Sequence, residues 1–235
     1  MRAVDGESMR KFYFNHEKWI IVLLMVILLP AGFIFLDYYS AHLYRSAGGA
    51  ERLYLPVDGW IRFSPHFVWT YLLYYPVCFL PLFLIGPIRV FRSIALGYTL
   101  QFLISFVLFA MLPIRMIRPE FHVVDSSTAV LKSIYALDPG YNIFPSLHVA
   151  NAFLVAFIFL KVRNKFEGAV LTIVAILISV SALYVKQHYF IDIAAGLVLA
   201  VVTFRIAFSP KIFNLGYPRI SADSSQDVLD RRDRA

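Results

Sequence analysis

The histidine and aspartate residues near the end of the chain have a spacing that could orient an imidazole. His188 and Asp192 are four residues apart, so on a helix they share a face and the carboxylate can accept a hydrogen bond from the ring. That bond fixes the tautomer and leaves the other ring nitrogen free to act as a nucleophile or base. The pair therefore predicts covalent or general-base chemistry at His188.

Basic and hydroxyl side chains elsewhere in the chain predict an anion site. Pro145 suits the first turn of a helix, and the free backbone N–H groups of that turn, together with the hydroxyl of Ser146, can bind an anion. Arg115 and Arg118 lie one turn apart if their segment is helical. Two guanidinium groups on one face would match the oxygens of a phosphate.

Each of these residues also has an ordinary interpretation. A histidine beside an apolar run can be interfacial, Arg118 can extend to lipid headgroups, and Pro145 can simply begin a helix. A metal site is the alternative for the histidines and Asp192, but neighbouring cations, including Lys186, attract an anion and repel a metal. The combination with a second histidine, His148, favours a phosphate ligand.

The composition indicates the elements that hold these residues. The 235-residue chain is 60% hydrophobic and 16% charged, against about 45–50% and about 25% in globular proteins, and its mean hydropathy is +0.69. This excludes a water-soluble domain. Apolar runs long enough to cross a bilayer occur at 19–36, 67–86, 93–113, 145–161, 168–185 and 189–208. We therefore predict an all-α integral membrane bundle of six transmembrane helices, the second kinked by Pro76 and Pro81.

The distribution of charge predicts the orientation. The net charge is +7, and Lys and Arg cluster at the ends of the apolar runs, with 15 on the side of the two termini and 7 on the other. By the positive-inside rule both termini are cytoplasmic and the polar clusters face the exterior or periplasm. A nucleic-acid partner is not expected, because the membrane already explains the charge.

The chain divides into three predicted parts. Residues 1–18 form a cytoplasmic segment, 19–208 the membrane domain, and 209–235 a cytoplasmic tail that is disordered from 221. The first run is too long for a signal peptide and no cleavage site follows it closely, so we predict a retained span. The single Cys78 excludes an intrachain disulfide, and the oligomeric state is not predicted.

These motifs together resemble the type 2 phosphatidic acid phosphatase superfamily, whose pattern is Lys-x6-Arg-Pro, Pro-Ser-Gly-His and Ser-Arg-x5-His-x3-Asp. The matching residues are Arg118 and Pro119; Pro145, Ser146 and His148; and Ser181, His188 and Asp192. The chain departs from the pattern at Met111, Leu147 and Ala182. Arg115 and Lys186 are the substitutes in charge for the missing lysine and arginine.

The resemblance implies a mechanism. His188 attacks phosphorus to form a phosphohistidine, Asp192 stabilises the imidazolium, and His148 protonates the leaving oxygen. The phosphoryl oxygens are held by Arg115, Arg118, Ser146 and Lys186, with Ser181 contributed by the third motif. Neither a metal nor another cofactor is required.

The same resemblance leaves the acceptor open. A lipid phosphate phosphatase, which cleaves an ester or anhydride with water, is the first interpretation. The stretches at 144–148 and 187–192 are similar to the inositol phosphorylceramide synthase branch and, more distantly, to sphingomyelin synthase, so a headgroup transferase is the alternative. A membrane protein that only binds anionic lipid is a further alternative, although binding needs no oriented imidazole.

Overall fold

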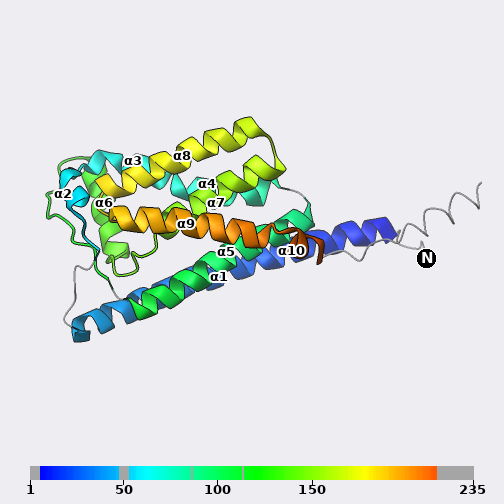
Figure 1. Ribbon diagram of the computed structural model, residues 1–235, viewed down its shortest axis with the longest axis horizontal. Helices are drawn as coiled ribbons and strands as arrows, with labels where there is room; N and C mark the ends of the chain where they lie inside the picture. Colours follow the sequence, from blue (N-terminus) through cyan, green and yellow to red (C-terminus); the bar gives the residue numbers. More distant parts are fainter. Residues whose placement is uncertain (1–5, 48–52, 86, 113, 216–235) are drawn as a thin grey trace, which may run out of the picture.

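The computed structural model describes residues 6–47, 53–85, 87–112 and 114–215. Their regular structure is helical, apart from one parallel bridge between Ile114 and Asn142, and this confirms the all-α class. The helices are α1 (Gly6–Ala47), α2 (Pro56–Trp60), the 3₁₀ turn η1 (Pro65–Phe67), α3 (Val68–Leu72), α4 (Tyr74–Leu84), α5 (Ile88–Met111), α6 (Ser126–Leu137), α7 (Leu147–Val162), α8 (Lys165–Tyr184), α9 (Phe190–Ala207) and α10 (Pro210–Leu215), shown in Figure 1.

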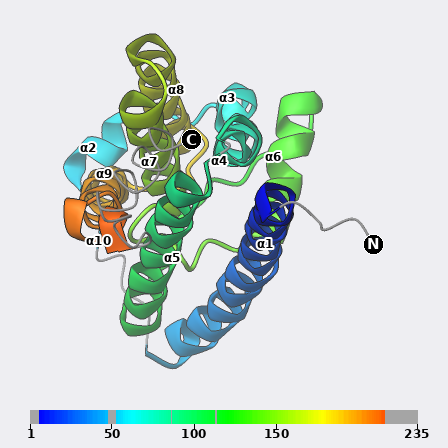
Figure 2. The ribbon, with the colours of Figure 1, turned by 90° about the vertical axis from the view of Figure 1, so that its right-hand side faces the viewer.

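Five helical segments in the described part of the chain are long and apolar enough to cross a membrane. They are His16–Leu43, Pro65–Leu84, Ile88–Met111, Lys165–Tyr184 and Phe190–Ala207. The sixth predicted span is α7, which has 16 residues and a length of about 24 Å at ~1.5 Å per residue. Because α7 is surrounded by α4, α5, α8 and α9 (Figure 2), it is apolar on nearly all sides and largely buried.

The second predicted span is divided at a different place from the one expected. The helix is interrupted at Leu73, between α3 and α4, and is not kinked at Pro76. Since α4 begins at Tyr74, Pro76 falls in the first turn, where a backbone N–H has no intrahelical partner. Its missing N–H therefore disrupts nothing, and Pro81 lies within the same helix.

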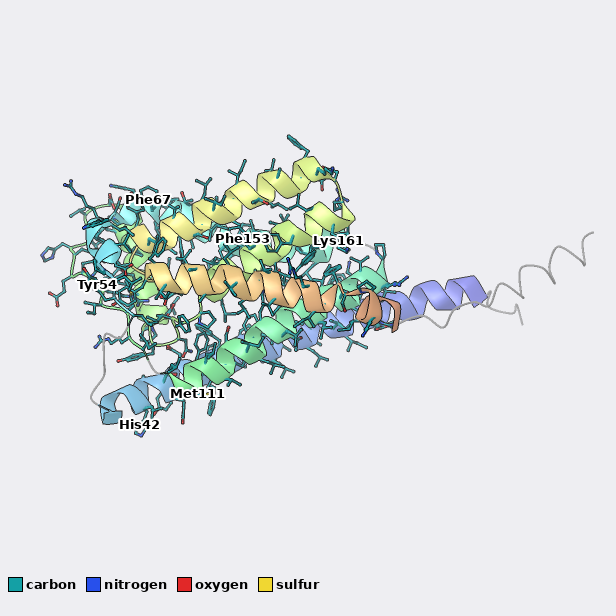
Figure 3. The ribbon with its side chains drawn as sticks, in the orientation of Figure 1. His42, Tyr54, Phe67, Met111, Phe153 and Lys161 are labelled. Atoms are coloured by element: carbon teal, nitrogen blue, oxygen red, sulfur yellow. The ribbon has the colours of Figure 1, made fainter. Side chains whose placement is uncertain are left out.

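The connections that carry the predicted site residues lie at one end of the bundle. Figure 3 shows Tyr54 and Phe67 at this end and Lys161 at the other, while α10 and the start of α1 also lie at the Lys161 end (Figure 1). Helix α6, which was not predicted, begins at the N-cap Asp125, whose carboxylate accepts the Thr128 N–H at 2.8 Å. The predicted disordered segment from 221 lies outside the described residues.

Candidate active site

His188 is positioned by the turn that ends α8. The N–H of Lys186 reaches the carbonyl of Leu183 at 3.3 Å, and that of Gln187 reaches the carbonyl of Ala182 at 2.9 Å. These two bonds form a Schellman motif, with Lys186 in the left-handed conformation (φ 50) that glycine usually takes there. The turn presents Gln187 and His188 to the interior, where both are buried.

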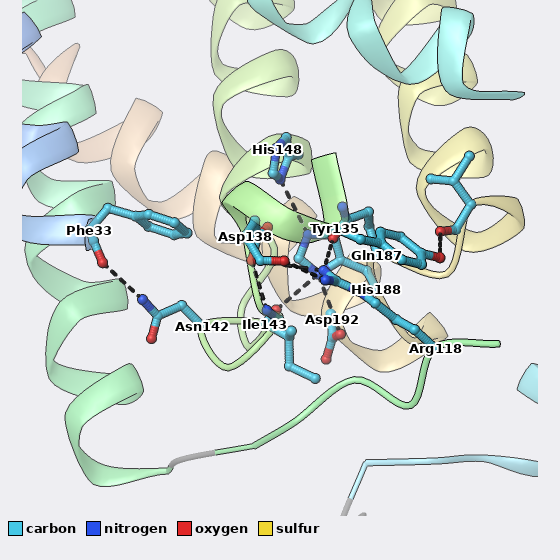
Figure 4. Close-up of polar contacts among 12 residues, drawn as sticks. Phe33, Arg118, Tyr135, Asp138, Asn142, Ile143, His148, Gln187, His188 and Asp192 are labelled. Carbon is cyan, nitrogen blue, oxygen red and sulfur yellow. Dashed lines mark hydrogen bonds and ion pairs between the residues drawn. The ribbon is translucent and has the colours of Figure 1, made fainter. Parts of the chain in front are cut away.

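The imidazole of His188 has partners on both ring nitrogens (Figure 4). Nδ1 lies 3.0 Å from the carbonyl oxygen of Ile143 and 3.5 Å from Oδ2 of Asp192, and Nε2 lies 3.3 Å from Nδ1 of His148. A carbonyl only accepts, so Nδ1 of His188 carries a hydrogen, and in the neutral imidazole Nε2 then keeps its lone pair. His148 must then be the donor in the contact between the two rings.

Asp192 lies near His188 for a reason other than the predicted one. The two residues do not share a helix face, because α9 begins at Phe190 and His188 precedes it. Asp192 is in the first turn, and its Oδ2 accepts the N–H of Tyr189 at 2.8 Å. The carboxylate thus caps its own helix and faces the ring of His188 at the same time.

His148 is the second residue of α7 and is held by aromatic side chains. Its Nε2 lies 2.6 Å from the hydroxyl of Tyr71, and its ring packs on the rings of Tyr71 and Tyr74 at 4.9 and 4.4 Å between centroids. With its Nδ1 donating to His188, Nε2 accepts from the Tyr71 hydroxyl. The hydrogen bonds therefore run in one direction, from Tyr71 through His148 to His188 and Ile143.

The close approach of α7 and α9 brings the two histidines together. The backbone N–H of Ser146 donates to the carbonyl of Asp192 at 3.2 Å. One turn further along α9, Gly196 lies so near α7 that an added Cβ would be 2.6 Å from the Ser146 carbonyl oxygen. The absence of a side chain at this glycine permits the crossing.

Arg118 is anchored beside the turn that carries His188. Its guanidinium donates to the backbone carbonyl of Asp138 and to Oε1 of Gln187, and it lies 4.2 Å above the ring of Tyr135. Gly140, with a φ of 80, packs against it, and a Cβ there would be 3.0 Å from Cζ. The guanidinium is thus fixed by two connections that are distant in sequence.

The predicted pairing of Arg115 with Arg118 is wrong. Their segment is not helical, so Arg115 and Arg118 are not one helical turn apart; Ile114 and Met116 are buried whereas Arg115 is exposed. Arg115 lies 5.6 Å from the ring of Tyr141. The segment therefore lacks the helical turn that the pairing with Arg118 required, and a phosphate contact by Arg115 stays a prediction.

The two predicted serine ligands are used within helices. The hydroxyl of Ser146 is the N-cap of α7 and accepts the Val149 N–H at 3.4 Å, so Pro145 precedes the cap and is not in the first turn as expected. The hydroxyl of Ser181 donates to the carbonyl of Ile178 at 2.7 Å. Both serines are fully buried.

Lys186 lines a cavity of about 230 Å³ that His188 also lines. Its ammonium donates to the carbonyls of Ile61 at 2.6 Å and Asp58 at 3.3 Å, and burial lowers the pKa of this lysine. The side chain therefore joins the turn after α8 to the segment of α2. Its contacts are with this backbone and not with the other predicted phosphate ligands.

Three residues at this site were not identified from the sequence. Gln187 binds Arg118, Tyr71 binds His148, and the buried carboxylate of Asp58 accepts the N–H groups of Phe190 and Leu55, each at 2.8 Å. Gln187 was detectable as the neighbour of His188. The other two lie in distant segments and belong to no motif.

The described residues include no group of three His, Cys, Asp or Glu side chains that could hold a metal ion. The carboxylates of Asp58 and Asp192 are turned toward backbone N–H groups. The neighbouring Asp138 accepts the Gly140 N–H at 2.9 Å. These side chains are therefore used to position the connections around His188.

Comparison with known proteins agrees with the motifs. A 62-residue stretch is 36% identical to a PA-phosphatase related-family protein of Dictyostelium discoideum, and covers 26% of this chain and 11% of that protein. The chain thus spans only a small part of this relative. The crystal structure of Aquifex aeolicus LpxE aligns with a TM-score of 0.43 at 20% identity, over 67% of this chain and 88% of that one. The model of the PAP2 superfamily matches residues 54–206, which contain both histidines, Arg118 and Asp192. The chain therefore belongs to the PAP2 superfamily.

Proposed function

We propose that the protein transfers the phosphoryl group of a lipid phosphate through a phosphohistidine on His188, with water as the first acceptor. The observation that carries this proposal is the contact of His188 Nδ1 with the Ile143 carbonyl at 3.0 Å. In the neutral ring this contact leaves Nε2 as the unprotonated nitrogen, on the side that faces His148. An oriented nucleophile beside a proton donor is what covalent catalysis requires.

In the first step Nε2 of His188 forms a bond to phosphorus as the bond from phosphorus to the leaving oxygen breaks. For this step His148 is an imidazolium with hydrogens on both ring nitrogens: the proton on Nδ1 passes to that oxygen, so the product leaves as a neutral alcohol, and the ring remains a neutral imidazole with its hydrogen on Nε2, beside the Tyr71 hydroxyl. The 3.3 Å contact between the two rings must open for phosphorus to approach Nε2. The positive charge of the phosphorylated imidazole is stabilised by Asp192 and the Ile143 carbonyl, and Arg118 offsets the charge of the phosphoryl oxygens.

In the second step water gives a proton to His148 and its oxygen attacks phosphorus. The bond from phosphorus to Nε2 breaks, and the electron pair returns to His188. No residue role in this cycle involves a metal ion, so we expect the purified enzyme to retain its activity in EDTA.

A headgroup transferase is the second candidate. It differs only in the acceptor, a lipid or polyol hydroxyl that replaces water in the second step. Two observations favour it: the likeness of 144–148 and 187–192 to the inositol phosphorylceramide synthase branch, and the cavity beside His188, whose lining includes Tyr54, Asp58 and Lys186. A cavity of about 230 Å³ has room for an acceptor larger than water.

The experiment uses purified full-length protein in mixed micelles with a panel of phosphorus-labelled lipid phosphates, with and without alcohol acceptors. Released phosphate indicates a phosphatase and a new labelled lipid indicates a transferase. An acid-labile, base-stable phosphoenzyme is expected from the native chain and none from His188→Ala, with the exposed His122→Ala as the matched control. Full turnover by His188→Ala would overturn the mechanism. Absence of turnover of any lipid by the native chain would favour the protein that only binds anionic lipid.

A further inference from the structure

The two histidine rings of the site have further partners that differ in charge. We infer that Tyr71 is the positioning residue of His148. Its hydroxyl holds the ring so that Nδ1 faces His188, and it accepts the Nε2 hydrogen while the ring is an imidazolium. This rests on the proposed function, because it concerns the proton that His148 gives to the leaving group.

The contact between Tyr71 and His148 is short and buried. The hydroxyl oxygen lies 2.6 Å from Nε2, and Tyr71 is 1% exposed. The phenol ring also lies against the imidazole, with 4.9 Å between the centroids and 40° between the planes. The imidazole is therefore held at one edge and on one face, and its other nitrogen, Nδ1, lies 3.3 Å from Nε2 of His188.

A hydroxyl can serve both protonation states of His148, because it is a donor and an acceptor. In the neutral ring of the resting site, the O–H of Tyr71 donates to Nε2. When both ring nitrogens carry hydrogens, the hydroxyl oxygen accepts from Nε2. This second bond is charge-assisted and is the stronger of the two. The O–H bond need only rotate, so the imidazolium forms in a buried site without losing its partner.

The charges of the two partners fit the two proposed roles. His188 gains positive charge when it is phosphorylated, and the carboxylate of Asp192 lies 3.5 Å from it. His148 must release its charge with the proton in the same step, and its partner is the neutral hydroxyl of Tyr71. A carboxylate favours the charged form of a ring and would hinder that release. A tyrosine holds the ring while the proton can still leave.

Tyr74 provides a comparison within the same site. Its ring packs on the imidazole of His148 with 4.4 Å between centroids, but its hydroxyl accepts the Nδ2 hydrogen of Asn151 at 2.8 Å. Two tyrosines thus contact one imidazole, and the hydroxyl of Tyr71 is the one that lies at a ring nitrogen. Phenylalanine variants of the two keep the aromatic contacts, so they separate the hydrogen bond from the packing.

The first test compares phosphatidic acid with its analogue in which sulfur replaces the oxygen that leaves. In the analogue, Nε2 of His188 bonds to phosphorus as the phosphorus–sulfur bond breaks, and the sulfur takes the electron pair. A thiol ionises at about pH 8.5, so a thiolate leaves without a proton, whereas an alkoxide needs one. The measured quantity is kcat/KM in the same micelles, which covers the steps up to departure of the leaving group.

The hydroxyl of Tyr71 should matter for the oxygen ester alone. Tyr71→Phe should lower kcat/KM for phosphatidic acid by about 10- to 100-fold, as expected for loss of a hydrogen bond to a charged group. It should lower the value for the sulfur analogue by less than about threefold. Tyr74→Phe should leave the ratio of the two values as in the native chain. Adding Tyr71→Phe to His148→Ala should cause no further loss, because Tyr71 acts through His148.

The second test needs no turnover. NMR of the full-length protein with isotope-labelled histidine reports which ring nitrogen carries the hydrogen, and His148→Ala identifies the signals of His148. The neutral ring in the native chain should carry its hydrogen on Nδ1, since the bond at one nitrogen sets the tautomer. Tyr71→Phe should give a mixture of tautomers, and Tyr74→Phe should keep the native one.

The outcomes separate this inference from the proposed function. Equal losses for the two lipids in Tyr71→Phe would show that Tyr71 only supports the fold around His148 and would overturn the inference. A tautomer that does not change in Tyr71→Phe, or a native ring with its hydrogen on Nε2, would overturn it as well. Absence of His188-dependent turnover of both lipids would instead overturn the proposed function, and the tautomer would still decide whether Tyr71 positions the ring.

Discussion

Two acceptors lie near the Nδ1 nitrogen of His188, a backbone carbonyl and a carboxylate. Which of them holds the ring determines how much turnover is lost when the carboxylate is mutated. The Ile143 carbonyl is the nearer, at 3.0 Å, and Asp192 lies at 3.5 Å. The carbonyl cannot be removed by a side-chain substitution. The tautomer of His188 is therefore maintained even when the carboxylate is altered.

This leads to a prediction for Asp192→Asn. The change removes the negative charge that stabilises the imidazolium but leaves the carbonyl in place, so turnover should fall by about 10²-fold, less than the ~10⁴-fold seen where the carboxylate alone sets the tautomer. The measurement is the rate of phosphoenzyme formation with labelled lipid in rapid-quench experiments. An effect as complete as that of His188→Ala would show that the carbonyl does not hold the ring.

Helices α7 and α9 cross beside the two histidines. Helix α9 crosses the start of α7 at Gly196, where an added Cβ would be 2.6 Å from a backbone oxygen. Backbone atoms of a packed helix cannot move aside as a flexible side chain can. Any residue larger than glycine must therefore displace α9, and Asp192 with it.

We accordingly expect Gly196→Ala to lower both kcat and the free energy of unfolding. Overpacking of this kind costs about 1–3 kcal/mol, and a displacement of ~1 Å at the site can reduce turnover by about 10²-fold. Thermal unfolding in detergent and steady-state rates measure the two effects. Gly97→Ala is the matched control, because the nearest atoms its Cβ would meet belong to side chains, Leu154 at 3.2 Å and Ala207 at 3.7 Å. Equal effects at both glycines would contradict the crossing as the cause.

The segment of α2 is fastened to the turn before α9 at two points. Asp58 binds the N–H of Phe190, and Lys186 binds the carbonyls of Asp58 and Ile61. His188 lies between these two attachments in sequence. Loss of either should loosen the same segment and allow the nucleophile to move.

The prediction is that Asp58→Asn and Lys186→Gln each reduce turnover, and that their effects are less than additive in the double variant. Each change should also lower the free energy of unfolding by about 1–3 kcal/mol through the loss of charged hydrogen bonds. The control is Lys132→Gln, because Lys132 is exposed on α6. Fully additive losses in kcat would indicate that Lys186 acts on the phosphate independently of α2.

At the scale of the whole molecule, the site lies at the end of the bundle opposite α10 and the start of α1. The cation distribution predicts that this end faces the exterior or periplasm. Large apolar side chains are exposed along α1, α5, α8 and α9, as expected of surfaces that contact lipid tails. The membrane domain proposed for 19–208 thus has its chemistry at one face.

A pair of introduced cysteines checks this orientation. In a Cys78→Ala background, Val124→Cys, at an 80% exposed position at the site end, should react with an impermeant maleimide in intact cells. Phe166→Cys, at a 78% exposed position in the first turn of α8, at the opposite end of the bundle, should react only after permeabilisation. The reverse pattern would place both termini outside the cell and the active site on the cytoplasmic side.

The sequence by itself determined the features that depend on local composition and spacing: the apolar spans, the all-α class, and the residues of the family motifs. Apolar runs are recognisable because the bilayer requires a fixed length of unbroken hydrophobic helix. The sequence did not predict α6, although the cap at Asp125 was a signal for it. It also did not predict that the backbone between Arg115 and Arg118 is not helical.

Only the tertiary structure decided which groups contact His188. The Ile143 carbonyl is 45 residues away in sequence and His148 is 40, while Gln187 meets Arg118 across 69 residues. A backbone carbonyl carries no signature in the identity of its residue, and hydrogen bonds between distant segments depend on how the helices cross. The sequence therefore supplied the reactive side chains, and packing of α7 against α9 decided their tautomers, neighbours and charge environment.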